Sequence, residues 1–262
     1  MLRRFLAKGR PSDRDALDRL RILQAQVVHA LATPPRELVE TWRSTWSRDD
    51  WTAFLTKMNE VRAALEADLR RDGLWKRMTR DEQLFVATPM LELTPQQHLN
   101  ASWLMEGAGC LLWALNLIEA LPPYDSPFDP EVLKGIPSDL VHPGRARLRP
   151  AVELDQARDR AELWHWRSRT RQVQEAGGFE ETLPEGLTFE RIVAMSASAA
   201  QERGDITQVL DGDFPAFGKP YRHATSDEYS ILTSIALERH RALNWLCGMA
   251  PGNRWHETPT DT

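Results

Sequence analysis

The chain has 262 residues, of which 42% are hydrophobic and 27% charged, and its formal net charge is -5 at neutral pH. These values are typical of a folded globular protein, and the length suits one large or two small domains. The acidic balance argues against a general nucleic-acid binder, because neutralising phosphates requires a basic surface. Ten tryptophans predict a well-packed interior, since each is a large apolar body with a single donor.

The two cysteines, Cys110 and Cys247, each lie within an apolar helical pattern. We expect both to be reduced, because two isolated cysteines make neither a disulfide framework nor a zinc site. Residues 1–15 lack the apolar core of a signal peptide. The longest apolar run, residues 107–118, falls short of the roughly 20 residues that cross a bilayer. These features predict a cytoplasmic protein with no membrane partner.

Helix-start signals recur along the chain, with little strand signal between them. Three of them are capping boxes, in which a threonine is followed three residues later by Glu or Gln, and they begin at Thr79, Thr94 and Thr225. The predicted helices cover residues 13–31, 37–46, 47–71, a short stretch after Thr79, 95–121, 150–174, 190–202 and 226–247.

Two segments lack a helical pattern. Residues 122–149 begin with Pro122-Pro123, are rich in proline and glycine, and read as an irregular connection. Residues 211–221 read as a loop with at most one short hairpin. The sequence therefore predicts an all-α, multi-helix single domain of about eight helices over residues 1–262. A subdivision near 122–149 stays open, and residues 1–11 and 257–262 are expected to be flexible.

The last predicted helix is apolar on nearly every side, yet it carries Glu238, Arg239 and His240 near its centre. Glu106 interrupts the apolar face of helix 95–121 in the same way, and His165 that of helix 150–174. Buried charges must be paired or must shift their pKa. We therefore expect these residues to converge in a polar centre inside the protein.

The candidate polar centre comprises Glu106, His165, Glu238, Arg239, His240 and Asn244, with Trp103, Trp113, Trp166 and Trp245 as its walls. One interpretation is a buried salt-bridge and hydrogen-bond network, which we favour because structural ion pairs also perturb pKa values. The other is a pocket in which Arg239 clamps an anion and a histidine moves a proton. No metal or cofactor is expected, because paired histidine motifs and Cys/His clusters are missing.

Three other patterns have simple structural interpretations. Gly107-Ala108-Gly109 lies inside a helix, which predicts close packing rather than a phosphate-binding loop. Asp211-Gly212-Asp213 resembles the start of a calcium loop but lacks the remaining ligands, so a turn is expected. The arginine-rich stretch 158–171 has interleaved tryptophans, a pattern that can bind nucleic acid, but mixed charges on a helix favour a solvated face.

Several blocks of the chain resemble a bacterial family known as domain of unknown function 4272. They are residues 101–103 with Glu106, 111–115, 148–150, 164–166 with Arg169, 238–240 with 242–246, and 255–262. The likeness begins near residue 15, and the final block is its most specific part. The resemblance implies that the polar-centre residues belong to the family pattern, but it supplies no activity and no catalytic residue.

The acidic balance, with neither a catalytic motif nor an export signal, favours a non-catalytic cytoplasmic interaction protein. One concrete form is an immunity-type neutraliser of a toxin, such as a basic nuclease. The alternative is a small-molecule binder or enzyme that uses a Glu/His/Arg pocket between helices. A structural scaffold or homo-oligomer is a third hypothesis, and the sequence leaves the oligomeric state open.

Overall fold

The structure is a computed structural model that describes residues 9–133, 146–177 and 183–261. Within these ranges the chain forms eight α-helices and one two-stranded hairpin, which confirms the predicted all-α class. The helices are α1 (Asp13–Leu31), α2 (Arg36–Thr45), α3 (Arg48–Arg71), α4 (Arg80–Ala87), α5 (Pro95–Ala114), α6 (Ala151–Glu175), α7 (Phe189–Arg203) and α8 (Ser226–Leu246). Short 3₁₀ helices are η1 (Leu74–Arg77), η2 (Met90–Glu92), η3 (Pro130–Leu133), η6 (Tyr221–His223), η7 (Pro251–Asn253) and η8 (Trp255–Glu257).

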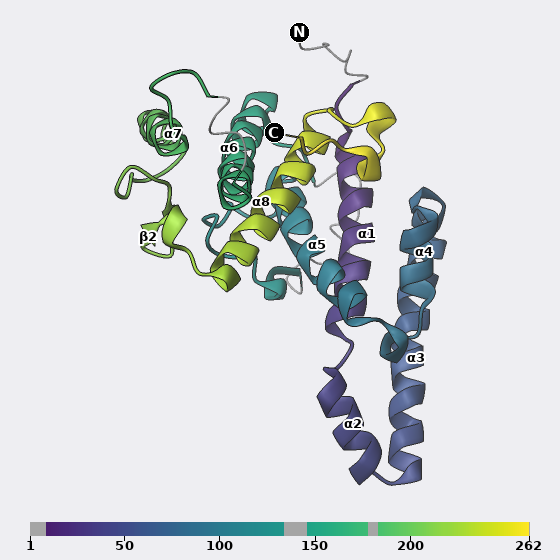
Figure 1. Cartoon of the computed structure of the whole chain (residues 1–262). Helices are drawn as coiled ribbons and strands as arrows, with labels where there is room; N and C mark the ends of the chain where they lie inside the picture. Colours follow the sequence, from purple (N-terminus) through teal and green to yellow (C-terminus); the bar gives the residue numbers. More distant parts are fainter. Residues whose placement is uncertain (1–8, 134–145, 178–182, 262) are drawn as a thin grey trace.

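Four helices form the body of the molecule (Figure 1). Helix α1 packs on α5, α5 packs on α8, and α8 packs on α6. One hydrophobic cluster runs through all four and includes Leu20, Leu111, Trp164 and Leu243. It also contains Tyr124, so helices on both sides of the 122–149 connection share a core with that connection.

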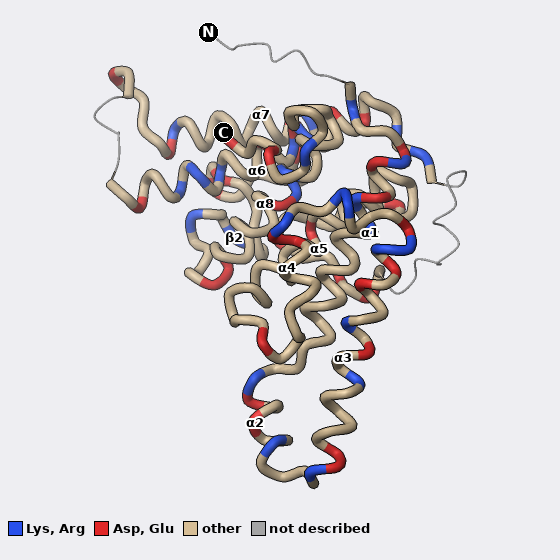
Figure 2. Tube along the Cα trace, turned by 90° about the vertical axis from the view of Figure 1, so that its right-hand side faces the viewer, with Lys and Arg blue, Asp and Glu red and all other residues tan. Residues whose placement is uncertain are grey.

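Helix α2 and the first half of α3 project from the body as a helical arm, residues 36–60 (Figures 1 and 2). No residue of α2 is buried, and in α3 only Leu69, near its C-terminal end, is buried. The base of α3 joins α1 and α4 through a small second cluster, made of Ile22, Ala25, Leu69, Leu74, Met78 and Val86. In the described ranges, no helix combines the length and the apolarity that a membrane crossing requires.

Helix starts follow the predicted capping chemistry. At Thr79, Thr94 and Thr225, the threonine hydroxyl accepts from the backbone N–H three residues on, and the Glu or Gln there accepts from the threonine N–H. Ser12 makes a fourth such box, with Asp15 as its partner. Each box satisfies two backbone donors that the first helical turn would otherwise leave unpaired.

The prediction that the helix starting at residue 95 runs to residue 121 is wrong, because α5 ends at Ala114. Asn116 adopts a left-handed conformation, with φ of 59°. The N–H of Leu117 then donates to Leu112 O, and the N–H of Asn116 donates to Trp113 O. These two bonds form a Schellman ending, in which asparagine takes the place usually held by glycine. The apolar residues beyond it, such as Ile118, pack on the core from an irregular segment.

The hairpin is as short as expected. Strand β1 (Pro215–Ala216) pairs antiparallel with β2 (Lys219–Pro220), and Pro215 lies opposite Pro220. Phe217 and Gly218 between them both have positive φ, which suits a tight two-residue hairpin turn. The rest of the expected loop leads from α7 back to α8 (Figure 1).

Both chain ends were expected to be flexible. Residues 1–8 and residue 262 lie outside the described ranges, as do 134–145 of the central connection. Arg10 forms an ion pair with Asp155 on α6, with 2.6 Å between Nη2 and Oδ1. Thr258 is buried, and the carbonyl of Pro259 accepts a hydrogen bond from Asn244. Flexibility of the remaining terminal residues stays a prediction.

Candidate functional site

The centre of the body contains an ion pair between Glu106 on α5 and Arg239 on α8. The distance from Arg239 Nε to Glu106 Oε2 is 2.8 Å, and the two side chains are 0% and 2% exposed. The other carboxylate oxygen of Glu106 accepts the backbone N–H of Phe128 at 2.8 Å. The pair therefore joins two helices and one loop in a space that solvent does not reach.

The remaining nitrogens of Arg239 hold the loop that follows α5. Nη1 donates to the carbonyls of Pro122 and Pro123 at 2.6 and 3.2 Å, and Nη2 donates to Ser126 O at 2.8 Å. The guanidinium also lies about 5 Å from the ring centroids of Tyr124 and Phe128, within cation–π range. Each guanidinium nitrogen thus has a protein partner, so this side chain is not available to clamp a ligand.

Burial raises the pKa of Glu106, while the Arg239 charge, the Phe128 N–H and the Arg239 hydrogen bond oppose that rise. A buried ion pair becomes tolerable when its oxygens and protons are hydrogen-bonded, as they are here. The geometry is that of an internal clamp between helices and loop. Of the two interpretations of the polar centre, it favours the structural network over the open pocket.

His165 and His240 form a second buried pair, separate from the first. Their Nδ1 atoms lie 3.1 Å apart, between α6 and α8. The amide Nδ2 of Asn244 lies 2.9 Å from His240 Nε2 and 2.8 Å from the Pro259 carbonyl. The carbonyl can only accept, so the amide group facing it is the nitrogen, and His240 Nε2 must accept as well.

This arrangement defines the tautomers of both rings. Because His240 Nε2 accepts, its proton sits on Nδ1 and is donated to His165 Nδ1, which leaves the proton of His165 on Nε2. Burial lowers the pKa of His240 to about 4, with smaller contributions from His165 and Arg158. Burial also lowers the pKa of His165. Both imidazoles are therefore neutral near pH 7 and form a chain of hydrogen bonds that ties α6, α8 and the C-terminal segment together.

Glu238 is buried but does not join either pair. Its two carboxylate oxygens lie 2.6 and 2.8 Å from Nη1 of Arg241, three residues along α8. Burial raises the pKa of Glu238, and the Arg241 charge opposes that rise. The six predicted residues thus divide into two buried pairs, one amide that extends the histidine pair, and one local ion pair.

The four tryptophans predicted as walls do not surround one space. Trp245 donates to Asn253 O and lies edge-on to Trp255. Trp113 faces the guanidinium of Arg149, and Trp103 and Trp166 are partly buried against the core. Of the four, only Trp245 lines either of the two cavities described here.

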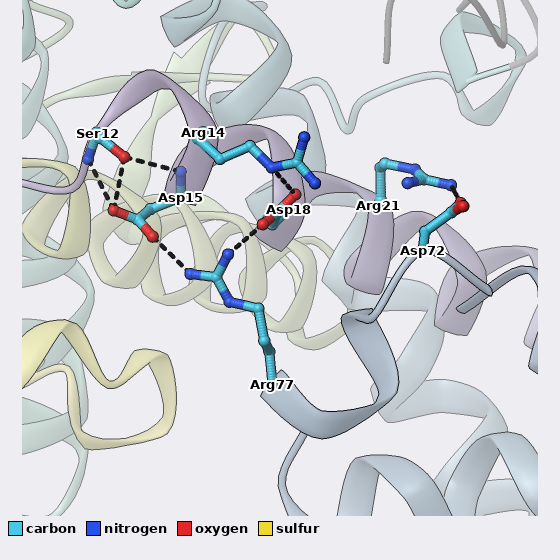
Figure 3. A network of polar contacts seen from close by, with 7 residues as sticks. All are labelled: Ser12, Arg14, Asp15, Asp18, Arg21, Asp72 and Arg77. Carbon is cyan, nitrogen blue, oxygen red and sulfur yellow. Dashed lines mark hydrogen bonds and ion pairs between the residues drawn. The ribbon is translucent and has the colours of Figure 1, made fainter. Parts of the chain in front are cut away.

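The first cavity has a volume of about 260 Å³ and lies between α1, η1 and the C-terminal 3₁₀ helices. Figure 3 shows three of its lining residues, Asp15, Asp18 and Arg77, together with neighbouring polar side chains that lie outside the lining. Arg77 from η1 bonds both Asp15 and Asp18, and Asp18 also pairs with Arg14 at 2.8 Å. Acids and bases here neutralise one another and join η1 to α1, so the network is a brace between elements.

The second cavity has a volume of about 550 Å³ and lies between α6, α7 and the loop before β1. Its base is a buried ion pair that the sequence interpretation missed, between Arg167 and Asp213. The expectation that the arginine-rich stretch is a solvated face is wrong at Arg167, which is 1% exposed. The available signal was spacing: Arg167 lies three residues after the buried Trp164 and three before the buried Thr170.

Two smaller expectations are confirmed. Asp211-Gly212-Asp213 is a turn, with positive φ at Asp211 and Gly212. The helical glycines serve close packing, because a Cβ on Gly109 would lie 2.4 Å from the ring of Phe128. A Cβ on Gly107 would lie 3.3 Å from the ring of Trp255.

The arm has an aromatic cluster at its tip. Trp42 and Trp46 are stacked, with ring centroids 5.0 Å apart, and Phe54 meets both rings edge-on. Trp51, one turn before Phe54 on α3, packs on the Phe54 ring. Trp46 remains exposed, as does Leu38 on α2. Three tryptophans and a phenylalanine thus gather at the end of the arm, while Leu38 lies eight residues before Trp46, near the start of α2.

Family comparison agrees with the resemblance over much of the chain. The family described as Domain of unknown function (DUF4272) matches residues 12–196. The match includes α1 to α6, with Glu106 and His165, and it ends before α8 and the block 238–246. No curated protein and no solved structure matches the chain. Because the match covers well over half of its length, the chain belongs to the DUF4272 family.

Proposed function

We propose that this protein is a non-catalytic interaction protein that binds a partner protein through the tip of its α2–α3 arm. The observation that carries the proposal is the aromatic cluster of Trp42, Trp46, Trp51 and Phe54 at the end of the arm. No residue of α2 is buried. Tryptophan is enriched among the residues that dominate binding energy at protein interfaces. An apolar tip held away from the core is a surface of that kind.

The arm also indicates how the partner is recognised. Basic and acidic residues alternate along it, so it carries no field of a single sign (Figure 2). Affinity would therefore come from apolar contact, and the partner surface we propose is an apolar groove that receives Trp46 and Leu38. Charge would act at longer range, where the net charge of -5 favours a basic partner.

Neutralisation of a basic toxin is the concrete form we propose for this interaction. Its support is the overall charge together with the arm, and the polar centre does not compete with it, because Glu106 and Arg239 are fully paired inside the body. An immunity-type protein needs no chemistry of its own, since it acts by occupying the toxin surface.

The test is co-expression of the full chain with the products of adjacent genes, scored by rescue of growth and by binding of the purified proteins. The double variant Leu38→Ser/Trp46→Ser should bind at least tenfold more weakly and should lose rescue. Met195→Ser is the matched control, because it removes an exposed apolar side chain from α7, and it should leave both readouts unchanged. Equal binding by the arm variant and the wild type would show that the arm is not the binding surface. If the wild type forms a dimer and the arm variant is a monomer, the partner of the arm is a second copy of this chain.

A further inference from the structure

The second cavity is large enough for a small molecule. Its volume of about 550 Å³ lies in the range of small-ligand sites. The C-terminal half of α6 provides Arg167 and Arg171, α7 provides Val193 and Ala194, and η6 provides Arg222. The cavity is distinct from the arm, so what it binds is independent of the proposed function.

Arg167 contributes an unused donor at the base of this cavity. Its Nε and Nη2 bond the two oxygens of Asp213 at 2.7 and 2.8 Å. Asp213 is then saturated, because it also accepts the backbone N–H groups of Phe214 and Arg222. Nη1 of Arg167 is buried and has no hydrogen-bond partner among the described residues. A buried donor without an acceptor is unfavourable. An oxygen from a ligand would relieve it once the Arg167 side chain shifts to expose Nη1, which solvent does not reach in the structure.

Two further guanidinium groups flank this donor. Arg171 lies 4.3 Å from the ring centroid of Tyr229, and its side chain is 14% exposed, while its acidic partner Glu175 is 54% exposed. Arg222 is 37% exposed, and its acidic partner Asp211 is 75% exposed. Arg171 and Arg222 are therefore more buried than their acidic partners Glu175 and Asp211, whereas Asp213 is buried with Arg167 at the base. Exposed pairs of this kind are weak, so an anion can take the acids' place at the arginines.

The opposite wall, on α7, combines the apolar side chains of Val193 and Ala194 with the exposed acid Glu190. Val193 is buried and Ala194 is half-buried on α7. Gly212 comes close to Ala194, because a Cβ at that position would lie 3.5 Å from the alanine Cβ. A ligand here would meet three guanidinium groups and short aliphatic side chains. Four carboxylates, those of Glu175, Glu190, Asp211 and Asp213, also line the cavity, so an anion must displace Glu175 and Asp211 from their arginines.

We propose that this cavity binds a small organic oxyanion, a carboxylate or phosphate group attached to a compact apolar body. Guanidinium groups match the geometry of both anions through paired N–H donors. Arg167 Nη1 would donate from the base, Arg171 and Arg222 would neutralise the charge, and Val193 with Ala194 would cover the apolar part.

Benzoate and phenyl phosphate are suitable probes for the full-length protein, with sodium chloride of equal ionic strength as the salt control. Calorimetry and the thermal unfolding midpoint should show saturable binding of at least one probe. Binding of benzoate alone assigns the site to carboxylates, and binding of phenyl phosphate alone assigns it to phosphates. If neither probe binds saturably, the proposal is overturned.

Two variants test the location. Arg171→Gln/Arg222→Gln leaves the Arg167–Asp213 pair intact and should weaken probe binding by about tenfold or more. Ala194→Leu fills the cavity from α7 without removing a charge, and it should abolish binding. Arg169→Gln, an exposed arginine on the same helix, is the matched control and should bind normally. Unchanged binding by both cavity variants would contradict this assignment.

Discussion

A single arginine organises much of the loop that follows α5. Arg239 donates to Glu106 and to the carbonyls of Pro122, Pro123 and Ser126. Prolines cannot donate backbone hydrogen bonds, so this loop depends on outside donors to satisfy its carbonyls. The guanidinium supplies several from one position, which explains how an irregular, proline-rich segment can pack inside the core.

The glycine beneath this loop gives a residue-scale prediction. Gly109→Ala would place a Cβ 2.4 Å from Phe128, whose N–H bonds Glu106. The overpacking should outweigh the gain in helix propensity and lower the free energy of unfolding by about 1–2 kcal/mol. Urea denaturation measures this loss of stability. Gly107→Ala is the milder comparison, because a Cβ there would lie 3.3 Å from its nearest neighbour, the ring of Trp255. A Gly109→Ala protein as stable as the wild type would show that Phe128 moves freely.

The ending of α5 is an element-scale feature that depends on Asn116. Asn116→Val should destabilise the protein relative to Asn116→Gly by about 1–2 kcal/mol, because a β-branched residue is strained at φ of 59°. Both variants lose the side-chain bond to Arg147 O, so the comparison isolates the backbone conformation. Equal stability of the two variants would mean that α5 can end in another way.

The arm should be energetically separate from the body. Phe54→Ala removes the centre of the aromatic cluster and should change the main unfolding transition by less than about 1 kcal/mol, because the arm lies outside the core. Leu111→Ala, in the core of α5, should cost about 2–5 kcal/mol. Chemical denaturation followed by circular dichroism makes the comparison. A larger loss for Phe54→Ala would show that the arm supports the fold, which would weaken the case for a free binding surface.

At the scale of the whole molecule, buried histidines should make stability depend on pH. Burial lowers the pKa of His29 and of His240 to about 4 and also lowers that of His165. The unfolded state binds these protons first, at its ordinary pKa of about 6.5, so acid favours unfolding. The stabilisation is complete above about pH 6.5 and is lost progressively as the pH falls toward about 4.

Urea unfolding at pH 7.5, 6 and 5 should therefore show a steadily falling free energy of unfolding. His240→Gln should flatten this dependence, whereas His256→Gln, which changes an exposed ring, should not. Below about pH 4.5, acids whose pKa the fold lowers, such as Glu82 and Asp13, add to the loss. Glu106 and Glu238, whose pKa burial raises, act in the opposite direction, so the comparison of His240→Gln with the wild type isolates the histidine contribution. The same pH dependence in both proteins would contradict the account of the buried histidines.

The sequence predicted most of the fold because its signals are local. Capping boxes such as Thr94 with Gln97 and helix-ending residues such as Gly248 act within a few positions, so they can be recognised without the rest of the chain. The end of α5 was misplaced because the apolar residues after Asn116 continue a helical pattern although the backbone turns. The ion-pair partners of the buried side chains were harder to predict. Glu106 with Arg239, and Arg167 with Asp213, are joined only by how the helices pack, which spacing along one helix does not reveal.

The most direct test of the structural role of the polar centre is the free energy of unfolding of Arg239→Met, measured by urea denaturation at neutral pH. Removing this partner leaves Glu106 buried without its counter-charge, so we expect a loss of about 3–5 kcal/mol. Arg36→Met, which breaks an exposed pair on the arm, should stay within about 0.5 kcal/mol of the wild type. An Arg239→Met protein that is as stable as the wild type would contradict the view that residue 239 holds the core together.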